Sequence, residues 1–150
     1  MTQPGPGTDN LITARFFVEI TGVTQAEFRE CSGLQAQTEV FEYKEGGMNR
    51  YTHKLPGRTS FSNVTLKWGS SATLALWEWY SRVSAKKDKS AELKSVSIIQ
   101  FDSQGTEKLR WNLSEAYPVK WTGPNFNAGE ASVAIESLEL AFADLTAVKR

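Results

Sequence analysis

The chain has 150 residues and a mass of 16.7 kDa, a size that allows one domain whose core needs no disulfide. Seventeen basic residues balance seventeen acidic ones and the pI is about 6.6, so the chain lacks the surplus positive charge that a dedicated nucleic-acid binder needs. The single cysteine, the single histidine and the lack of an apolar run of ~18 residues exclude an internal disulfide, clustered Cys or His metal ligands and a membrane-spanning helix.

Residues 1–13 are polar and contain several Gly and Pro residues, and we expect them to form a flexible tail. They carry neither the positive charge nor the apolar stretch of a secretory signal. The sequence therefore predicts a protein that is made and folds in the cytoplasm, with residues 14–150 as its single domain.

Three strands are predicted in the first half of the chain. Within residues 15–20, Phe16 and Val18 alternate with other residues at the period of two that is typical of a strand. The same alternation recurs over residues 37–43 and 62–68.

Residues 44–58 lie between the second and third of these strands and show no clear periodicity. Connections of about 15 residues are uncommon in compact domains unless they have a function. We therefore interpret this stretch as a functional loop, in which Gly46 and Gly47 allow a turn at positive φ.

One helix is predicted over residues 71–85. The side chain of Ser71 or Thr73 is expected to accept a hydrogen bond from an unpaired amide of the first turn. Helical spacing places five side chains on the face that we expect to pack on the sheet: Leu76, Trp77, Tyr80, Val83 and Ser84. On this prediction, Trp77 buries its ring.

Further strands are predicted in the second half. Residues 94–101 and 107–113 form a hairpin around a turn at 102–105, and residues 118–121 form a short strand. A last strand is predicted within residues 131–145.

The last predicted strand contains a change of parity. Val133 and Ile135 share one face, whereas Leu138 and Leu140 share the other. Either a β-bulge near residues 136–137 restores a single apolar face, or both faces are covered.

The order of these elements predicts the fold class. Three strands, one helix and three or four further strands indicate a mainly β protein. We expect two packed antiparallel sheets, arranged as a sandwich or barrel, with one flanking α-helix.

Candidate catalytic groups have little support. His53 could act as a base oriented by Glu42 or Glu45, but it lies in a polar loop without a nucleophile motif. Cys31 has no basic neighbour in sequence closer than Arg29, which is weak support for an activated thiolate. We therefore predict no catalytic, cofactor-binding or metal-binding residues.

The aromatic content is the more useful signal. The chain contains eight Phe, five Trp and four Tyr residues, and several predicted strands carry rings or branched apolar side chains on both faces. One small domain has limited interior, so we expect another chain to cover part of this surface. The alternative is a carbohydrate-binding face built from Trp68, Trp111 or Trp121.

Several sequence blocks occur in a specific order and spacing. They are RFFVEITGV at 15–23, FRECSGL ending at residue 34, FEYKEGGMNRYTHKLPG at 41–57, NVTLKWG at 63–69, LWEWY at 76–80, AYPVKWTGP at 116–124 and VAIESLELAF at 133–142. In this order they resemble the tail-tube proteins of contractile phages and contractile injection systems. The blocks at 45–57 and 116–124 are more similar to injection systems than to phages.

The resemblance implies a single tail-tube domain over residues 14–150, with two sheets packed at an angle and a flanking helix. It also implies that six subunits form a ring by pairing edge strands, and that rings stack into a hollow tube. Residues at about 44–58 are implied to form an extended arm that contacts neighbouring subunits through the following residues: Glu45, Gly46, Gly47, Met48, Asn49, Arg50, Tyr51, His53, Leu55 and Pro56.

We accordingly expect a structural subunit, not an enzyme, that forms a conduit for cargo delivery within a phage tail or phage tail-like particle assembled in the bacterial cytoplasm. Expected partners are other copies of the chain, the surrounding sheath, baseplate, hub and tube-terminating proteins, and cargo in the lumen. No cofactor and no dedicated nucleic-acid or membrane binding is expected. The alternatives are a tube-initiating or tube-terminating adaptor of the same fold and a monomeric carbohydrate-binding β-sandwich.

Overall fold

The computed structural model of the protein describes residues 15–23, 27–44, 46–47, 52–87 and 90–150. Strands dominate these residues, together with one α-helix and one short 3-10 helix. The tail predicted over residues 1–13 lies outside the described part of the chain.

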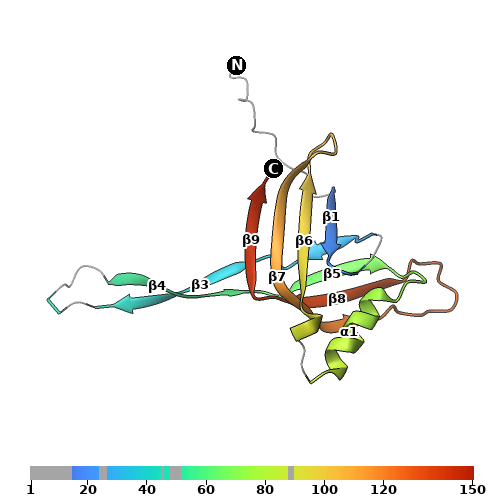
Figure 1. The fold of residues 1–150 in the computed structure, drawn as a ribbon, viewed down its shortest axis with the longest axis horizontal. Coiled ribbons are helices and arrows are strands. Elements are labelled where there is room, and N and C mark those ends of the chain that lie inside the picture. Colours follow the sequence, from blue (N-terminus) through green and yellow to red (C-terminus); the bar gives the residue numbers. More distant parts are fainter. Residues whose placement is uncertain (1–14, 24–26, 45, 48–51, 88–89) are drawn as a thin grey trace, which may run out of the picture.

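Four antiparallel strands form the first sheet, in the order β1-β6-β7-β9. They are β1 (Phe16–Ile20), β6 (Lys94–Phe101), β7 (Glu107–Thr122) and β9 (Asp144–Lys149). Figure 1 shows these strands standing side by side. The strands predicted over residues 15–20 and 94–101 are confirmed, whereas those predicted over 107–113 and 118–121 are parts of one continuous strand.

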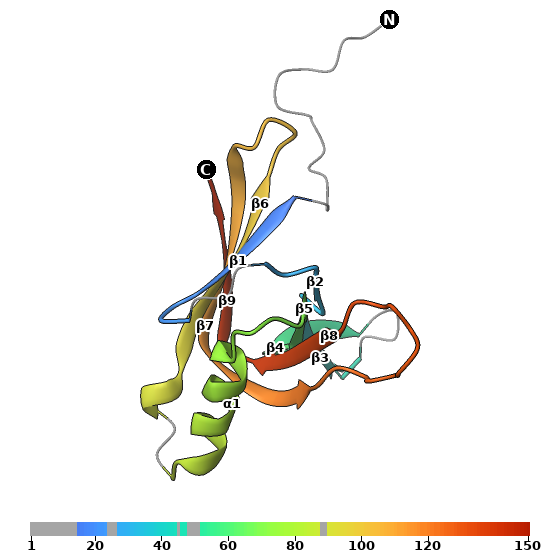
Figure 2. The ribbon, with the colours of Figure 1, turned by 90° about the vertical axis from the view of Figure 1, so that its right-hand side faces the viewer.

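The second sheet lies at an angle to the first, as Figure 2 shows. Its strands are β2 (Glu30–Ser32), β5 (Val64–Gly69), β8 (Ile135–Ala141) and the second half of β7, in the order β2-β5-β8-β7. Residues from both sheets and the helix form one core: Val18, Ile20, Val64, Leu66, Trp68, Leu76, Trp79, Val83, Val96, Ile98, Leu113, Ala116, Leu138 and Leu140. The prediction of two packed antiparallel sheets with a flanking helix is confirmed.

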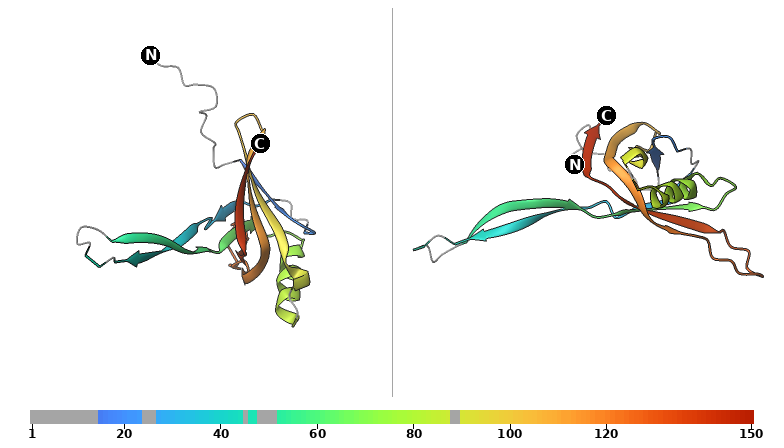
Figure 3. Two further views of the ribbon diagram at one scale, coloured as in Figure 1. Left: turned by 60° about the vertical axis from the view of Figure 1, so that its left-hand side comes forward. Right: turned by 60° about the horizontal axis from the view of Figure 1, so that its bottom comes forward.

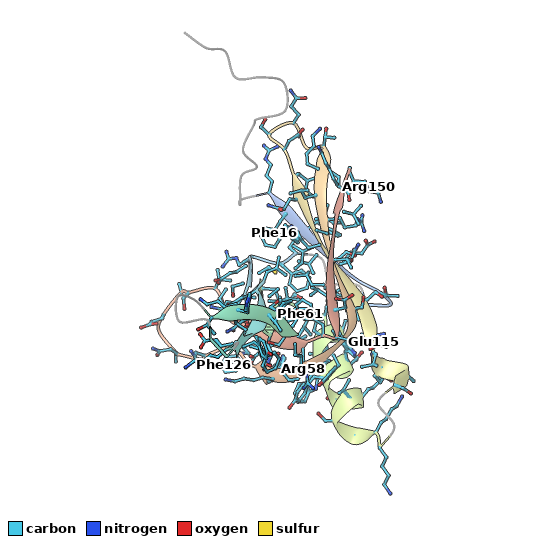
Figure 4. The ribbon with its side chains drawn as sticks, turned by 90° about the vertical axis from the view of Figure 1, so that its left-hand side faces the viewer. Phe16, Arg58, Phe61, Glu115, Phe126 and Arg150 are labelled. Atoms are coloured by element: carbon cyan, nitrogen blue, oxygen red, sulfur yellow. The ribbon has the colours of Figure 1, made fainter. Side chains whose placement is uncertain are left out.

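Strand β7 passes from one sheet to the other at a bulge. Lys94 pairs with Ala116 and Val96 with Leu113, so β7 has one extra residue between these pairs. Glu115 lies there with a φ of 52°, at the foot of the upright sheet in Figure 4. Because a bulge bends its strand and increases the local twist, β7 can continue into the second sheet without a break.

Strand β8 explains the change of parity near its start. It pairs with β5 without interruption, from Val64 opposite Leu140 to Gly69 opposite Ile135. Of the two alternatives that the sequence leaves open, the bulge near residues 136–137 is therefore wrong. Glu136, which is only 7% exposed, occupies a position facing the core, so a carboxylate breaks the apolar pattern while the strand itself stays regular.

Strands β3 (Ala36–Tyr43) and β4 (His53–Phe61) form a separate antiparallel hairpin. It projects from the rest of the molecule, to the left in Figure 1 and in both views of Figure 3. The prediction of a loop over residues 44–58 is wrong from His53 onward, because β4 begins there. Pro56 and Gly57 interrupt the sequence of β4, which shows no alternation of apolar and polar residues and therefore does not indicate a strand. Most residues of this hairpin are exposed.

Helix α1 (Ala75–Ala85) packs against β7. Its N-cap is Leu74, which makes no capping hydrogen bond through its side chain. The Ser71 hydroxyl instead accepts a hydrogen bond from the amide of Thr73 at 3.4 Å, before the helix begins. The predicted cap at Ser71 or Thr73 is therefore wrong.

The buried face of α1 differs from the predicted one in its tryptophan, which is Trp79 and not Trp77. Leu76, Trp79 and Val83 are buried, whereas Trp77 is 39% exposed. Trp77 packs over Tyr80 and Trp121 at the surface, with ring centroids 5.9 and 4.6 Å away. A spacing of three residues leads from Leu76 to Trp79, and a spacing of four leads from Trp79 to Val83, so these three residues form the face that meets the core.

The 3-10 helix η1 (Ser90–Glu92) is tied to α1 through Glu92. The indole Nε1 of Trp79 donates a hydrogen bond to the Glu92 carbonyl at 2.9 Å. Lys86 Nζ and Arg82 Nε donate to the Glu92 carboxylate at 2.6 and 3.2 Å. The hydrogen bond from Lys86, supported by Arg82, lowers the pKa of Glu92 below its ordinary value of 4.5 against the opposing effect of burial.

We expect Trp79→Ala to destabilise the subunit by about 3–5 kcal/mol, because it leaves a large cavity and removes the partner of the Glu92 carbonyl. Trp77→Ala should lower the melting temperature much less, because its ring lies at the surface. Thermal unfolding followed by circular dichroism compares the two variants. Equal losses would show that the buried face of α1 is assigned incorrectly.

The Glu92 contacts also predict a pH dependence. The folded pKa lies below the ordinary value, so the stabilisation is present above pH 4.5 and is lost as the pH falls through the folded pKa. Glu92→Gln should therefore reduce the stability difference between pH 7 and pH 3. Urea unfolding of both proteins across this range measures the effect, and identical pH profiles would contradict it.

Candidate inter-subunit surface

The hairpin formed by residues 36–61, here called the arm, exposes most of its surface. All of β3 is exposed, and so are the large apolar side chains of Val40, Phe41, Tyr43 and Leu55. Within the described residues each arm strand pairs only with the other, so both outer edges are open. Open edges and exposed apolar side chains are features of a surface that another chain covers.

Strand register divides the arm into two faces, since directly opposed residues point to the same side. Phe41 lies opposite Leu55 and Tyr43 opposite His53. We call this side the aromatic face, formed by Phe41, Tyr43, His53 and Leu55. The other side carries Val40, Glu42, Lys54 and Pro56.

Gly57 allows the Phe41 ring to lie across the arm. A Cβ atom at Gly57 would lie 2.5 Å from Cε2 of Phe41 and 3.2 Å from Cβ of Glu39. No side chain fits there without moving the ring. Beyond this point the strand register shifts between Thr38 and Val40, and the hydroxyls of Thr38 and Thr59 lie 2.9 Å apart.

The predicted interface residues fall in three places. Gly46 and Gly47 lie in a turn at the arm tip, where Gly47 has the positive φ expected from sequence, 95°. His53, Leu55 and Pro56 lie within β4. The remaining predicted residues lie outside the described part of the chain: Glu45, Met48, Asn49, Arg50 and Tyr51.

Sequence reasoning missed the apolar residues of β3 as part of this surface. Val40, Phe41 and Tyr43 are exposed. The feature of the sequence that could have identified them is their position directly before a polar segment that contains glycine. The arm rejoins the body at Phe61, whose ring packs 5.6 Å from that of Phe142. The chain therefore re-enters the body beyond residues 55–57, which lie within β4.

A second surface feature is a pocket of about 460 Å³ beside β2, between the two sheets. Its lining residues are Phe16, Arg29, Glu30, Cys31, Leu34, Ile98, Gln100 and Trp111. Trp111 Nε1 donates a hydrogen bond to Gln100 Oε1 at 2.7 Å. Burial, together with the negative charge of Glu30, raises the pKa of Cys31 to about 11, so its sulfur is a protonated thiol at neutral pH.

The tryptophans predicted as a possible carbohydrate-binding face lie in different parts of the structure. Trp68 is buried in the core, Trp111 lines the pocket, and Trp121 packs against Trp77. These three tryptophans therefore form no common carbohydrate-binding face. The described residues contain no group of three or more His, Cys, Asp or Glu side chains that could hold a metal ion, and none of their helices is long and apolar enough to cross a membrane.

A family model described as the T4-like virus tail tube protein gp19 matches residues 12–146. No curated protein matches the chain in a sequence comparison.

Solved structures are similar over nearly the whole chain. The chain is 29% identical to a chain of the anti-feeding prophage tube-terminating cap, with a TM-score of 0.80 and coverage of 95% of this chain and 93% of that one. It is 25% identical to a chain of the sheath-tube complex of the extracellular contractile injection system PVC, with a TM-score of 0.82 and coverage of 96% and 95%. Hcp1 from Flavobacterium johnsoniae is 14% identical, with a TM-score of 0.55 and coverage of 90% and 95%, which shows a similar fold alone.

Removing the arm should leave the body folded, because the core contains none of the arm residues. We expect a variant with residues 39–58 replaced by Asn-Gly to keep the melting temperature of the body and to lose self-association. A two-residue turn can join Thr38 to Thr59, since these residues are directly opposed and neither is a proline. Circular dichroism and sedimentation measure both properties, and a variant that changes only Gly46 to Asn keeps the arm length as a control. Normal assembly without the arm would contradict this prediction.

Proposed function

The chain belongs to the family of T4-like virus tail tube proteins, and from this membership we propose that it is the repeating, non-enzymatic subunit of the inner tube of a contractile injection system or contractile phage tail. The single observation that carries the proposal is the sheet β1-β6-β7-β9, whose two outer strands pair with no further strand among the described residues.

The strand directions of this sheet suit a ring. Each of its three pairings is antiparallel, so the two outer strands, β1 and β9, run in opposite directions. When copies follow one another in the same orientation, β9 of one copy meets β1 of the next as an antiparallel pair. One repeated contact can thus continue the sheet from copy to copy and close it, which removes both open edges.

The proposed ring contains six copies, and rings stack into a tube. A 24% identical chain comes from an anti-feeding prophage baseplate structure described as 6-fold symmetrised, which supports this number. The arm leaves the body on the β9 side of the upright sheet (Figure 1), which points it toward the copy that β9 contacts.

Further partners follow from the same proposal. Similar chains come from structures of a sheath-tube complex and of a sheath/tube terminator, and we propose sheath, baseplate, hub and terminator contacts for this chain, with cargo in the lumen. Residues 14–150 act as one domain, and assembly takes place in the bacterial cytoplasm.

A tube-initiating or tube-terminating adaptor is the second candidate, because identity is 29% to the cap chain and 25% to the sheath-tube chain. Negative-stain microscopy of the purified protein distinguishes the two functions. A repeating subunit forms long tubes or stackable six-fold rings, whereas an adaptor forms isolated rings that need a partner to extend. Monomers at all concentrations would contradict both.

The contact between β9 and β1 can be tested with one proline. The amide of Arg150 donates to the carbonyl of Lys108 on β7 at 2.9 Å. Alternation along an antiparallel strand then directs the amide of Ala147 away from β7. Ala147→Pro removes an outward donor without removing a hydrogen bond to β7, so we expect a folded subunit that forms no rings.

Ala147→Val, which keeps the amide, is the matched control and should assemble normally. Circular dichroism measures folding and electron microscopy measures ring formation. Normal rings from Ala147→Pro would show that β9 does not form the contact between subunits.

A further inference from the structure

We propose that the pocket beside β2 is the acceptor site for the arm of a second copy of this chain, and that the aromatic face of that arm enters the space between the two sheets. This inference rests on the proposed ring and goes beyond it, because it assigns the surface that the arm contacts.

The pocket lining combines apolar and charged side chains. Its large apolar residues are Phe16, Ile98, Trp111 and Leu34, of which Leu34 is 36% exposed. Arg29 and Glu30 are its charged residues. Its volume of about 460 Å³ falls within the range of pockets that bind small ligands and side chains, and such pockets are mostly apolar with a few polar groups.

The arm supplies matching chemistry. Phe41 and Leu55 lie side by side on its aromatic face, and both are more than half exposed. The arm cannot fill the pocket of its own chain as a continuous hairpin, since it projects away from the body (Figure 3). A surface knob and a pocket elsewhere on the same molecule are the two halves of a head-to-tail contact.

The proposed ring brings the two halves together. The arm leaves on the β9 side of the upright sheet, and the pocket residue Phe16 lies on β1, the opposite edge (Figures 1 and 4). When β9 pairs with the next copy's β1, the arm therefore extends toward the edge that carries that copy's pocket.

The arm is also long enough for this contact. One subunit adds four strands to the ring, which span roughly 19 Å at the usual strand spacing. The arm strands have 8 and 9 residues, which corresponds to about 26–30 Å. The arm thus reaches past the junction and over the neighbouring subunit.

The charges of the two surfaces are compatible. Glu30, which lines the pocket, forms an ion pair with Lys67 at 3.4 Å, and Arg29 adds a positive charge. On the arm, Glu42 and Lys54 lie opposite each other on the other face, so they point away from the pocket. The aromatic face itself carries no carboxylate, ammonium or guanidinium group, so the contact joins no block of like charges.

Disulfide crosslinking between engineered cysteines tests the assignment. Burial raises the pKa of Cys31 to about 11, which makes its thiol a slow reactant, so the test uses Leu34→Cys at the pocket in a Cys31→Ser background. This change is combined with Phe41→Cys on the aromatic face, and the assembled protein is oxidised with copper phenanthroline. The matched control replaces Phe41→Cys with Val40→Cys, the adjacent residue on the other face.

We expect a ladder of covalent multimers from the Phe41→Cys combination on non-reducing gels, and several-fold less product from the Val40→Cys combination. Tubes or rings that form without face-specific crosslinks would overturn the arm-to-pocket contact and leave the proposed function intact. Failure of the wild-type protein to form rings would overturn both. If Phe41→Cys alone prevents assembly, Leu55→Cys provides the same test from the opposite strand.

Hydrogen exchange provides a measurement without substitution in the arm or pocket. Amides of residues 30–34 should exchange more slowly in wild-type rings than in the unassembled Ala147→Pro subunit. Equal protection in both would overturn the proposal, because it would mean that no arm covers these residues in the rings.

Discussion

Both sheets depend on one strand. Along its first half β7 pairs with β6 and β9, and along its second half it pairs with β8. The extra residue at Glu115, with its positive φ, is what allows one strand to serve two sheets that lie at an angle. The position of the helix follows from the same strand, since α1 packs on β7 and buries Leu76, Trp79 and Val83 in the core between the sheets. The angle between the sheets also leaves the pocket open beside β2.

The residues that form the core and the residues that form the exposed apolar surface of the arm are different sets. The core residues come from the two sheets and α1, and the arm contributes none. The arm instead exposes apolar side chains that a monomer leaves uncovered, together with two open strand edges. From this division we expect substitutions in the arm to affect association, and substitutions such as those at Trp79 to affect folding.

Sequence patterns predicted the strands whose residues alternate. β1, β5 and β6 follow the period of two because Val18, Val64 and Val96 face the core, and β3 was predicted from the same alternation although all of its residues are exposed. β4 was missed because Pro56 and Gly57 interrupt its sequence, which shows no such alternation. The choice of Trp77 over Trp79 failed because Trp77 was grouped with Tyr80 and Ser84 on one helical face, whereas the buried face is the one on which Trp79 lies three residues after Leu76 and four before Val83. The pocket could not be predicted at all, as its residues come from β1, β2, β6 and β7, which only the folded topology brings together.

The arm also affects how a polymer of this chain would start. A two-stranded hairpin without a covered face is marginally stable in water, so a free subunit must lose conformational entropy when its arm docks. Two free subunits meet with few contacts to offset that loss, whereas a subunit that joins a completed ring gains contacts with several copies at once. Elongation is then favoured over spontaneous nucleation, and a template that resembles a finished ring controls where and how many filaments begin.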